Sequence, residues 1–365
     1  MTDYDYMKYA IELAGKGRGW TNPNPLVGAV IVKNNQIIGA GYHERYGELH
    51  AERNAIASLK ESAEGATIYV TLEPCCHYGK TPPCTDAIIE QKIARVVIGS
   101  RDPNPKVAGK GAAILRNAGI RVEEDFMREA CDALNPIFFH YITEKTPYVV
   151  AKYAMTADGK IATYTGASKW ITGELARKKV QELRKTYMGI MVGIGTVLAD
   201  DPLLNARITG ARNPIRIICD SWLRIPPESQ ICQTADTYET IVACAVGREQ
   251  CPEKWEQLTL LGIKLISVPG EQGQVDMKKL MGILGEMGID SILLEGGGTL
   301  AYSALQAGIV KEVKAFVAPK IFGGKDALSP VEGAGIELPS QAVGLALEQV
   351  SRIGEDLLLE YKVRG

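Results

Sequence analysis

Strand-like and helix-like segments alternate along almost the whole chain, and this alternation restricts its possible folds more than any other feature. Short apolar runs such as "ATIYVTL" (66–72) and "RVVIGS" (95–100) are typical of buried strands. Segments predicted to be helical, for example near 82–91 and 109–118, lie before and after them. Alternation of this kind predicts an α/β architecture in which helices cover a sheet.

One interruption divides this pattern into two halves. The segment "TEKTPYVVAKYAM" (143–155) joins a polar stretch with Pro147 to the start of a new β-rich run. Because 365 residues favour about two domains, we place a boundary here and expect domains over 1–145 and 146–365. In the first domain we predict, among others, a helix near 3–16, a hairpin turning at 34–35, a helix near 50–61 and one closing helix near 127–143. In the second we predict eight strands with helices near 174–187, 276–287 and 299–307.

Charge and hydropathy exclude several classes of protein. Lys plus Arg number 41 against 43 for Asp plus Glu, so no positive field favours nucleic acid. No apolar run approaches the roughly 20 residues that cross a bilayer, and the N-terminus "MTDYDYMKYAIELAGKG" is an amphipathic helix pattern unlike a secretory leader. We therefore expect a cytoplasmic protein without membrane contact, whose eight cysteines are reduced.

Two phrases in the first half predict a metal site. "ELHAERNAIASLK" (48–60) places His50 where a helix begins, and "LEPCCHYGKTPPC" (72–84) contains Cys75 and Cys84. A catalytic zinc takes three protein ligands and leaves a fourth position for water. A thiolate near a helix start is stabilised by the helix dipole and by free backbone N–H groups. His50, Cys75 and Cys84 are thus candidate zinc ligands.

The presence of Glu52 distinguishes a catalytic zinc site from a structural zinc site. Zinc deaminases carry H-x-E followed by P-C-x-x-C, and the glutamate moves protons without binding metal. Here "HAE" fits, whereas nine positions rather than three separate the two cysteines. A closed structural site with Cys76 or His77 as fourth ligand stays open as an alternative, although such a site has no use for Glu52.

The second half contains two glycine-rich strand ends. In "SILLEGGGTLAYSALQAG" we predict a buried strand that is followed by Glu295 and by three glycines at the start of a helix. In "MVGIGTVLADDPLLNAR" a strand is likewise followed by a glycine-rich turn, which contains Thr196. Such glycines let backbone N–H groups approach an anion, or they only permit a tight turn. Neither phrase is the G-x-G-x-x-G fingerprint of a Rossmann fold.

The motifs of the first half resemble the deaminase domain of the bifunctional riboflavin-biosynthesis deaminase/reductases. "NPNPLVGAVIV", "HAE", "YVTLEPCCHYGKTPPC" and "DPNPKVAGKG" follow one another in that family's order, and the long cysteine spacing is typical of it. Cys76 stands where the family usually has serine. The resemblance implies a cytidine-deaminase-like three-layer α/β/α domain with one Zn²⁺. It also implies substrate contacts from Asn24, Lys80, Asp102 and Asn104.

The second half is similar to the reductase domain of the same family. "AKYAMTADGKIAT", "SKWIT", "VGIGTVLADDPLLNAR", "RIICDS" and "EGGGTL" match in order. The resemblance implies a dihydrofolate-reductase-like α/β domain that uses NADPH. The implied NADPH contacts are Ala154, Trp170, Thr196, Asp200, Ser221, Gly297, Gly298, Thr299, Leu300, Ala301, Tyr302 and Ser303. The implied substrate contacts are Ser168, Arg184, Leu204, Arg207 and Glu295. We also expect Arg184 and Arg207 to converge on the substrate's 5′-phosphate, because a guanidinium binds phosphate bidentately.

Together the resemblances imply two consecutive reactions on small pyrimidine ribosyl phosphates. The first deaminates 2,5-diamino-6-(5-phosphoribosylamino)pyrimidin-4(3H)-one, and the second reduces the ribose of 5-amino-6-(5-phosphoribosylamino)uracil to the ribityl chain. We expect a homo-oligomer, a dimer or a tetramer. One alternative is a nucleic-acid or free-nucleotide deaminase with an appended non-catalytic nucleotide-binding domain, which the charge balance and the cysteine spacing disfavour. The other is a regulator without turnover, which Glu52 disfavours.

Overall fold

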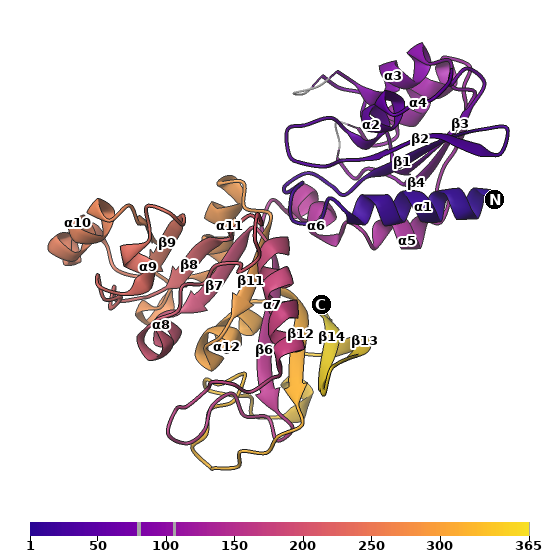
Figure 1. The fold of residues 1–365 in the computed structure, drawn as a ribbon. Coiled ribbons are helices and arrows are strands. Elements are labelled where there is room, and N and C mark those ends of the chain that lie inside the picture. The colour runs from indigo at the N-terminus through magenta and orange to yellow at the C-terminus, as the bar shows by residue number, and fades with distance from the viewer. Residues whose placement is uncertain (79–81, 105–106, 365) are drawn as a thin grey trace. The chain divides into compact units, whose positions relative to one another are not determined.

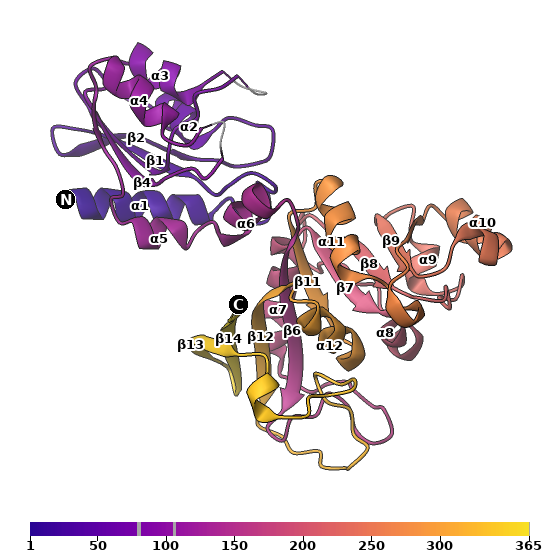
Figure 2. The ribbon, with the colours of Figure 1, turned by 180° about the vertical axis from the view of Figure 1, so that it is seen from behind.

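Residues 1–78, 82–104 and 107–364 are described by a computed structural model (Figures 1 and 2). The chain divides into two units, Met1–Lys145 and Thr146–Gly365. Lys80, for which a substrate contact is expected, lies outside the described residues.

The first unit is built on a mixed sheet with the strand order β2-β1-β3-β4-β5 within the described residues. Its strands are β1 (Gly28–Lys33), β2 (Gln36–Tyr42), β3 (Thr67–Leu72), β4 (Arg95–Ser100) and β5 (Arg121–Glu123). β1 pairs antiparallel with both β2 and β3, whereas β3, β4 and β5 are parallel. The predicted hairpin turn is confirmed, because Asn34 and Asn35 both adopt the positive φ angles that suit a two-residue turn.

Helices cover both faces of this sheet (Figure 1). They are α1 (Asp3–Gly15), α2 (Ala51–Ala57), α3 (Cys84–Glu90), α4 (Lys110–Asn117), α5 (Arg128–Asp132) and α6 (Pro136–Glu144). Side chains alternate across each strand, so Ile31 packs with α2, α3 and α4, whereas Val30 packs with α1 and Cys131 of α5. The predicted three-layer α/β/α arrangement is confirmed.

The single helix predicted near 127–143 is wrong, because the chain forms two helices separated at 133–135. Asn135 adopts a non-helical backbone and Pro136 begins α6, and proline lacks the N–H that would continue the helix before it. The Asn135 side chain instead forms two hydrogen bonds with the backbone of Leu26, accepting from its N–H at 2.7 Å and donating to its carbonyl at 2.9 Å. The break therefore ties this end of the unit to the segment that precedes β1.

The predicted helix near 50–61 is shorter in the structure, where α2 ends at Ala57. The hydroxyl of the next residue, Ser58, bonds to the backbone of Ala40 in β2, accepting from its N–H at 2.8 Å. This side chain directs the chain toward the sheet and ends the helix.

The second unit has a long sheet with the strand order β10-β9-β8-β7-β11-β6-β12-β14-β13 within the described residues. Its strands are β6 (Tyr148–Thr156), β7 (Gly189–Gly193), β8 (Ile215–Cys219), β9 (Thr240–Cys244), β10 (Lys264–Ser267), β11 (Ser291–Glu295), β12 (Val310–Ala318), β13 (Leu345–Ile353) and β14 (Asp356–Val363). From β10 to β12 neighbouring strands are parallel, and the β13–β14 hairpin adds an antiparallel edge.

Helices also cover both faces of the second sheet. They are α7 (Glu174–Thr186), α8 (Ile194–Asp200), α9 (Gln230–Gln233), α10 (Pro252–Leu260), α11 (Met277–Glu286) and α12 (Gly298–Gln306). Met191 and Ile217 pack with α11 and α12, whereas Ile190 and Ile218 pack with α8, α9 and α10. The sequence did not predict α8, α9, α10 or β13. The glycine-rich segment around Thr196, for which no helix was predicted, forms the helix α8. Strand β13 lacks a buried side that would produce alternation of apolar and polar residues.

In the part of the chain that the structure describes, every helix is too short or too polar to cross a membrane.

Close packing of α1 on β1 generates a prediction about stability. A Cβ atom at Gly28 would lie 2.0 Å from the carbonyl oxygen of Ala10, whereas one at Gly15 would meet nothing within 4 Å. Gly28→Ala should lower the free energy of unfolding of the first unit by roughly 1–3 kcal/mol, as overpacked sites do. The matched control Gly15→Ala should raise it slightly, by up to about 1 kcal/mol, since alanine favours helix. Urea unfolding followed by circular dichroism compares the two, and equal stabilities would contradict the packing described.

Candidate active sites

Three segments of the first unit bring His50, Cys75 and Cys84 together. His50 directly precedes α2, Cys75 follows β3, and Cys84 is the first residue of α3. His50 Nδ1 lies 3.4 Å from Cys75 Sγ and 3.5 Å from Cys84 Sγ. The three ligand atoms lie within 4.8 Å of one another. One imidazole and two thiols at such distances match the donors that zinc prefers.

Backbone N–H groups of α3 hold the loop that carries Cys75. The N–H of Cys84 donates to the Cys75 carbonyl at 3.1 Å and lies 3.4 Å from its sulfur. Hydrogen bonds that the Cys75 sulfur accepts from the Cys84 thiol and from His50 lower the pKa of Cys75. The cluster therefore favours one thiolate even without metal. Among the described residues, neither Cys76 nor His77 joins this cluster, so the alternative of a closed structural site has no fourth protein ligand here.

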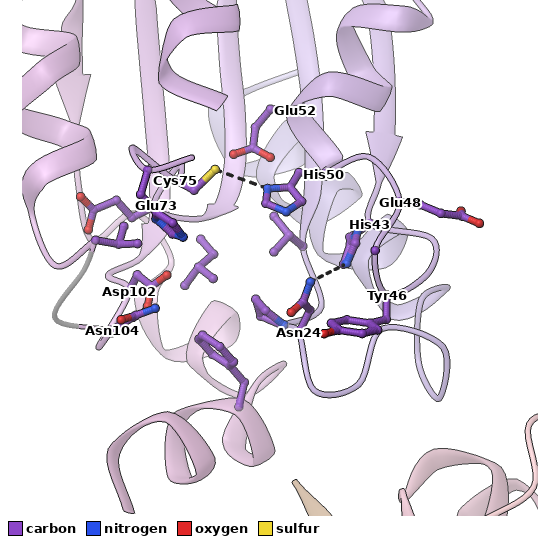
Figure 3. A pocket seen from close by; sticks show the side chains of 17 residues that line it. Asn24, His43, Tyr46, Glu48, His50, Glu52, Glu73, Cys75, Asp102 and Asn104 are labelled. Atoms are coloured by element: carbon purple, nitrogen blue, oxygen red, sulfur yellow. Dashed lines mark hydrogen bonds between the residues drawn. The ribbon is translucent and has the colours of Figure 1, made fainter. Parts of the chain in front are cut away.

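Glu52 lies in the first turn of α2 and is 3% exposed. Its carboxylate points toward His50 and Cys75 (Figure 3). Burial raises the pKa of Glu52, and the nearby Cys75 raises it further. A buried carboxyl group with a raised pKa beside a candidate metal site is suited to accepting and returning a proton.

A cavity of about 270 Å³ opens beside this cluster. Asn24, His43 and Tyr46 lie on one side of it, and Glu73, Asp102 and Asn104 lie on the other (Figure 3). The sequence predicted Asn24, Asp102 and Asn104, and all three line the cavity. Cys84 is fully buried and does not line it.

His43 was not predicted, although it fixes the orientation of Asn24. Its Nδ1 lies 3.0 Å from the carbonyl oxygen of Leu49, which can only accept, so this nitrogen carries the proton. Its Nε2 then accepts from the amide of Asn24 at 3.3 Å. Burial lowers the pKa of His43, which keeps the ring neutral. The only feature of the sequence that could have indicated a role for His43 was its position directly after a predicted strand.

Glu73 was also not predicted and supports the opposite wall. Its carboxylate is buried and accepts hydrogen bonds from the N–H groups of Gly109 at 2.9 Å and Ala112 at 3.1 Å, at the start of α4. Asp102, on the same wall, has its pKa raised to about 6 by burial. A sequence signal existed, because Glu73 is the acidic residue of "LEPC", directly after a buried strand.

In the second unit a cavity of about 470 Å³ lies at the carboxyl ends of β6, β7 and β11. The residues of the resemblance that line it are Ala154, Ser168, Arg184, Thr196, Asp200, Leu204, Glu295, Gly297, Gly298, Thr299 and Ala301. Ser221, Leu300 and Ser303 line a neighbouring cavity of about 330 Å³, which shares Gly195, Gly297 and Thr299 with the first. A Cβ at Gly195 would meet nothing within 4 Å, so a long phosphate-bearing cofactor such as NADPH can approach the backbone where the cavities join.

A group of buried charges lies in the larger cavity. Arg184 binds the Glu295 carboxylate bidentately, through Nε at 2.8 Å and Nη2 at 3.1 Å, and Lys152 Nζ reaches the same carboxylate at 3.2 Å. Burial alone would raise the pKa of Glu295, but the two cations outweigh it and lower this pKa to about 2. Lys152 was not predicted, although a lysine inside the apolar run "YVVAKYAM" was a usable signal.

Three of the residues for which the family resemblance implies cofactor or substrate contacts line neither cavity. Arg207 is exposed, and its backbone N–H donates to Gln181 at 3.1 Å. Trp170 is exposed beneath the guanidinium of Arg177, which lies 4.6 Å from its ring centroid. The hydroxyl of Tyr302 donates to the carbonyl of Gly335 at 2.7 Å. The expected convergence of Arg184 and Arg207 on the substrate's 5′-phosphate stays a prediction. Arg184 lines the larger cavity and binds Glu295, whereas Arg207 lies outside both cavities.

Comparisons with known proteins match both halves. Residues 147–359 match the family model of the RibD C-terminal domain, and residues 1–100 match the cytidine and deoxycytidylate deaminase zinc-binding region. A riboflavin biosynthesis protein RibD from Actinobacillus pleuropneumoniae is 57% identical over 363 residues, covering 100% of this chain and 96% of that relative. The counterpart from Bacillus amyloliquefaciens is 44% identical, with 98% and 95% covered.

Solved structures agree with these matches over the full length. The Acinetobacter baumannii RibD structure has a TM-score of 0.88 at 37% identity and covers 100% of this chain and 99% of its own. A deaminase/reductase structure from Thermotoga maritima has a TM-score of 0.87 at 39% identity, with 99% and 98% covered. The matches confirm the cytidine-deaminase-like and reductase-type α/β folds predicted for the two halves.

The buried carboxylate of Glu73 generates a prediction about the first site. Glu73→Gln keeps the size of the side chain but replaces one acceptor oxygen with a donor that faces an N–H group. Leaving a buried donor unpaired costs about 1–3 kcal/mol, so the variant should unfold more easily and process a deaminase substrate with a raised KM. Glu129→Gln, an exposed control on α5, should change neither property. Thermal unfolding and steady-state kinetics test this, and a Glu73→Gln protein with wild-type KM would show that the wall does not depend on Glu73.

Proposed function

Because this chain belongs to the RibD family of bifunctional riboflavin-biosynthesis enzymes, we propose that residues 1–145 carry its zinc-dependent deaminase activity and residues 146–365 its NADPH-dependent reductase activity. The similar protein from Thermotoga maritima is named a diaminohydroxyphosphoribosylaminopyrimidine deaminase/5-amino-6-(5-phosphoribosylamino)uracil reductase. We assign the same pair of reactions on small pyrimidine ribosyl phosphates to this chain. The meeting of His50, Cys75 and Cys84 beside buried Glu52 is the observation that carries the proposal.

In the deaminase half, we assign His50, Cys75 and Cys84 as the zinc ligands. Zinc bound there lowers the pKa of a water molecule. The Glu52 carboxylate would accept one proton of the attacking water and deliver it to the ring nitrogen. It would then take the proton of the new hydroxyl group and supply it to the departing ammonia, so that the carboxylate is regenerated. Its raised pKa suits this exchange, since the group must both take and release a proton.

The walls of the same cavity hold the pyrimidine. Neutral His43 orients Asn24, whose amide can bind the ring on one side. Asp102 and Asn104 face it from the other side, as Figure 3 shows. Lys80, outside the described residues, is assigned to the ribose phosphate from the resemblance alone.

In the reductase half, NADPH supplies the hydride that reduces the substrate ribose. We assign Ala154, Thr196, Asp200, Ser221 and the 297–303 segment to this cofactor, with Trp170 following from the resemblance. Ser168, Arg184, Leu204, Arg207 and Glu295 are assigned to the substrate. Glu295 fixes Arg184 and Lys152 at one wall of the cavity, and because one carboxylate faces two cations, the group keeps a net positive charge near an anionic substrate.

We also propose a cytoplasmic homo-oligomer that does not bind nucleic acid. β13 is the last strand of its sheet within the described residues, and Leu347 and Val350 on it are 57% and 53% exposed. An edge strand with exposed apolar side chains favours pairing with another chain, here a second copy. The net charge of −2 gives no attraction for a polyanion.

Because the two activities are assigned to separate sites, a substitution in one site should abolish only the activity of that site. Glu52→Gln removes the proton carrier, so deamination should fall by about a hundredfold to ten-thousandfold. Reduction of the already deaminated substrate, measured by the absorbance of NADPH, should stay near the wild-type rate. A folded Glu52→Gln protein that loses both activities would refute the assignment to two sites.

The metal assignment predicts different effects for neighbouring cysteines. Cys84→Ser removes a thiolate ligand and should cost most of the bound zinc together with deamination. Cys76→Ser changes a thiol outside the cluster and should leave both nearly unchanged. Metal analysis of the purified variants decides between them. Retention of zinc in Cys84→Ser, with its loss in Cys76→Ser, would overturn the ligand set.

A further inference from the structure

The two cysteines of the candidate zinc site are tied to each other through the backbone. The N–H groups of Cys84 and Thr85, in the first turn of α3, donate to the carbonyl of Cys75 at 3.1 Å and 3.2 Å. These bonds hold the two cysteines together although nine positions separate them in the sequence. They do not involve α2, which His50 directly precedes. The geometry of the cluster therefore also depends on how α2 is held against the start of α3.

The side chain of Arg53 joins these two parts of the site. It lies on α2, three positions after His50, so about one helical turn separates the two residues. Its Nε donates to the carbonyl of Pro82 at 3.1 Å, and its Nη2 donates to the carbonyl of Pro83 at 2.9 Å. Pro83 directly precedes Cys84. One guanidinium on the helix of the histidine thus binds the two residues before a cysteine of the cluster.

The local backbone transmits this contact to the Cys84 sulfur. The acceptors are consecutive carbonyls, and a planar guanidinium with several N–H donors can bind both at once. The rings of Pro82 and Pro83 restrict the φ angle of each residue, and Cys84 is already the first residue of α3. Little backbone freedom therefore remains between the bonded carbonyls and the sulfur, so fixing the carbonyls also fixes the thiol.

Neither substrate contact nor helix stabilisation accounts for the position of Arg53. Arg53 is not among the described residues that line the cavity of about 270 Å³, so a role in holding the pyrimidine does not follow. A cation at the start of a helix opposes the helix dipole, so its charge does not stabilise α3. Asp86, in the first turn of α3, supplies the favourable charge there. What Arg53 contributes is the link between α2 and the start of α3.

We propose that Arg53 is a positioning residue of the zinc site, which holds the start of α3 against α2 so that His50 meets the two cysteines before metal binds. Residues that orient metal ligands without touching the metal contribute to affinity, because the ligands need not be ordered on binding. Arg53 itself forms no bond to zinc, since a guanidinium has no acceptor atom. This inference rests on the proposed deaminase function of residues 1–145.

Zinc affinity, measured by competition with a chromophoric chelator, tests this role without relying on turnover. Arg53→Met keeps an unbranched side chain but removes its donors, and it should weaken zinc binding by about tenfold to a hundredfold. Arg53→Lys keeps the charge without the planar fork, so it should recover part of the loss. Both variants retain the three ligands and Glu52. Saturating zinc should therefore return deamination close to the wild-type rate.

Arg116→Met is the matched control. Arg116 on α4 also donates to a backbone carbonyl, that of Val122 at 3.5 Å. The control should leave zinc affinity unchanged, even where it lowers the melting temperature as much as Arg53→Met does. Should Arg53→Met fail to fold, Arg53→Lys decides by the same measurement.

The contrary outcomes separate this inference from the proposed function. Wild-type zinc affinity in folded Arg53→Met would overturn the inference while leaving the metal assignment intact. A deamination rate that saturating zinc does not restore would also overturn it, because Arg53 would then act in the chemistry. Wild-type protein that binds no zinc would overturn the zinc assignment, and the inference with it.

Discussion

Both candidate sites depend on parallel strands whose carboxyl ends meet at one edge of a sheet. In the first unit β3 and β4 are parallel, and the backbone N–H of Glu73 after β3 donates to the carbonyl of Ser100 at the end of β4. This pairing places the loop with Cys75 beside the loop with Asp102. In the second unit the register of β11 and β6 puts Glu295 directly opposite Lys152. Strand register therefore decides which side chains meet, before any side-chain interaction contributes.

Two buried carboxylates in these sites have opposite electrostatic surroundings. Glu295 is surrounded by Arg184 and Lys152, which lower its pKa to about 2, so it is an anion at neutral pH and fixes both cations. Glu52 is buried beside Cys75, whose thiolate charge favours the neutral carboxyl group, and the opposing effect of His50 is smaller. Burial alone does not decide the role of a carboxyl group, because the neighbouring charges determine whether it holds its charge or exchanges protons.

The sequence was sufficient to predict residues whose chemistry appears in local motifs. His50, Glu52 and Cys75 follow from residue type and local motif, and Cys84, whose spacing departs from the motif, follows from its predicted helix start and from the family resemblance. His50, Cys75 and Cys84 meet in the structure because each lies near the end of a regular element. His43, Glu73 and Lys152 were missed because their partners, Asn24, the start of α4 and Glu295, are distant in sequence. The break at Asn135 was missed for the same reason, since the bonds that stabilise it go to Leu26. Strand β13 was missed because its exposed residues have no buried alternate face.

The paired hydrogen bonds between Asn135 and Leu26 set a lower limit on the size of an autonomous fragment. The match to the deaminase zinc-binding region stops at residue 100, which suggests a truncation there for producing the metal site alone. Such a fragment would contain His50, Cys75 and Cys84 but would leave both backbone groups of Leu26 unpaired, two residues from Asn24. It would also lack Phe138, which packs in the core shared by α2, α3 and α4 and lines the cavity. We therefore expect the smallest excisable first unit to end after α6, well beyond Cys84, the last of the assigned zinc ligands.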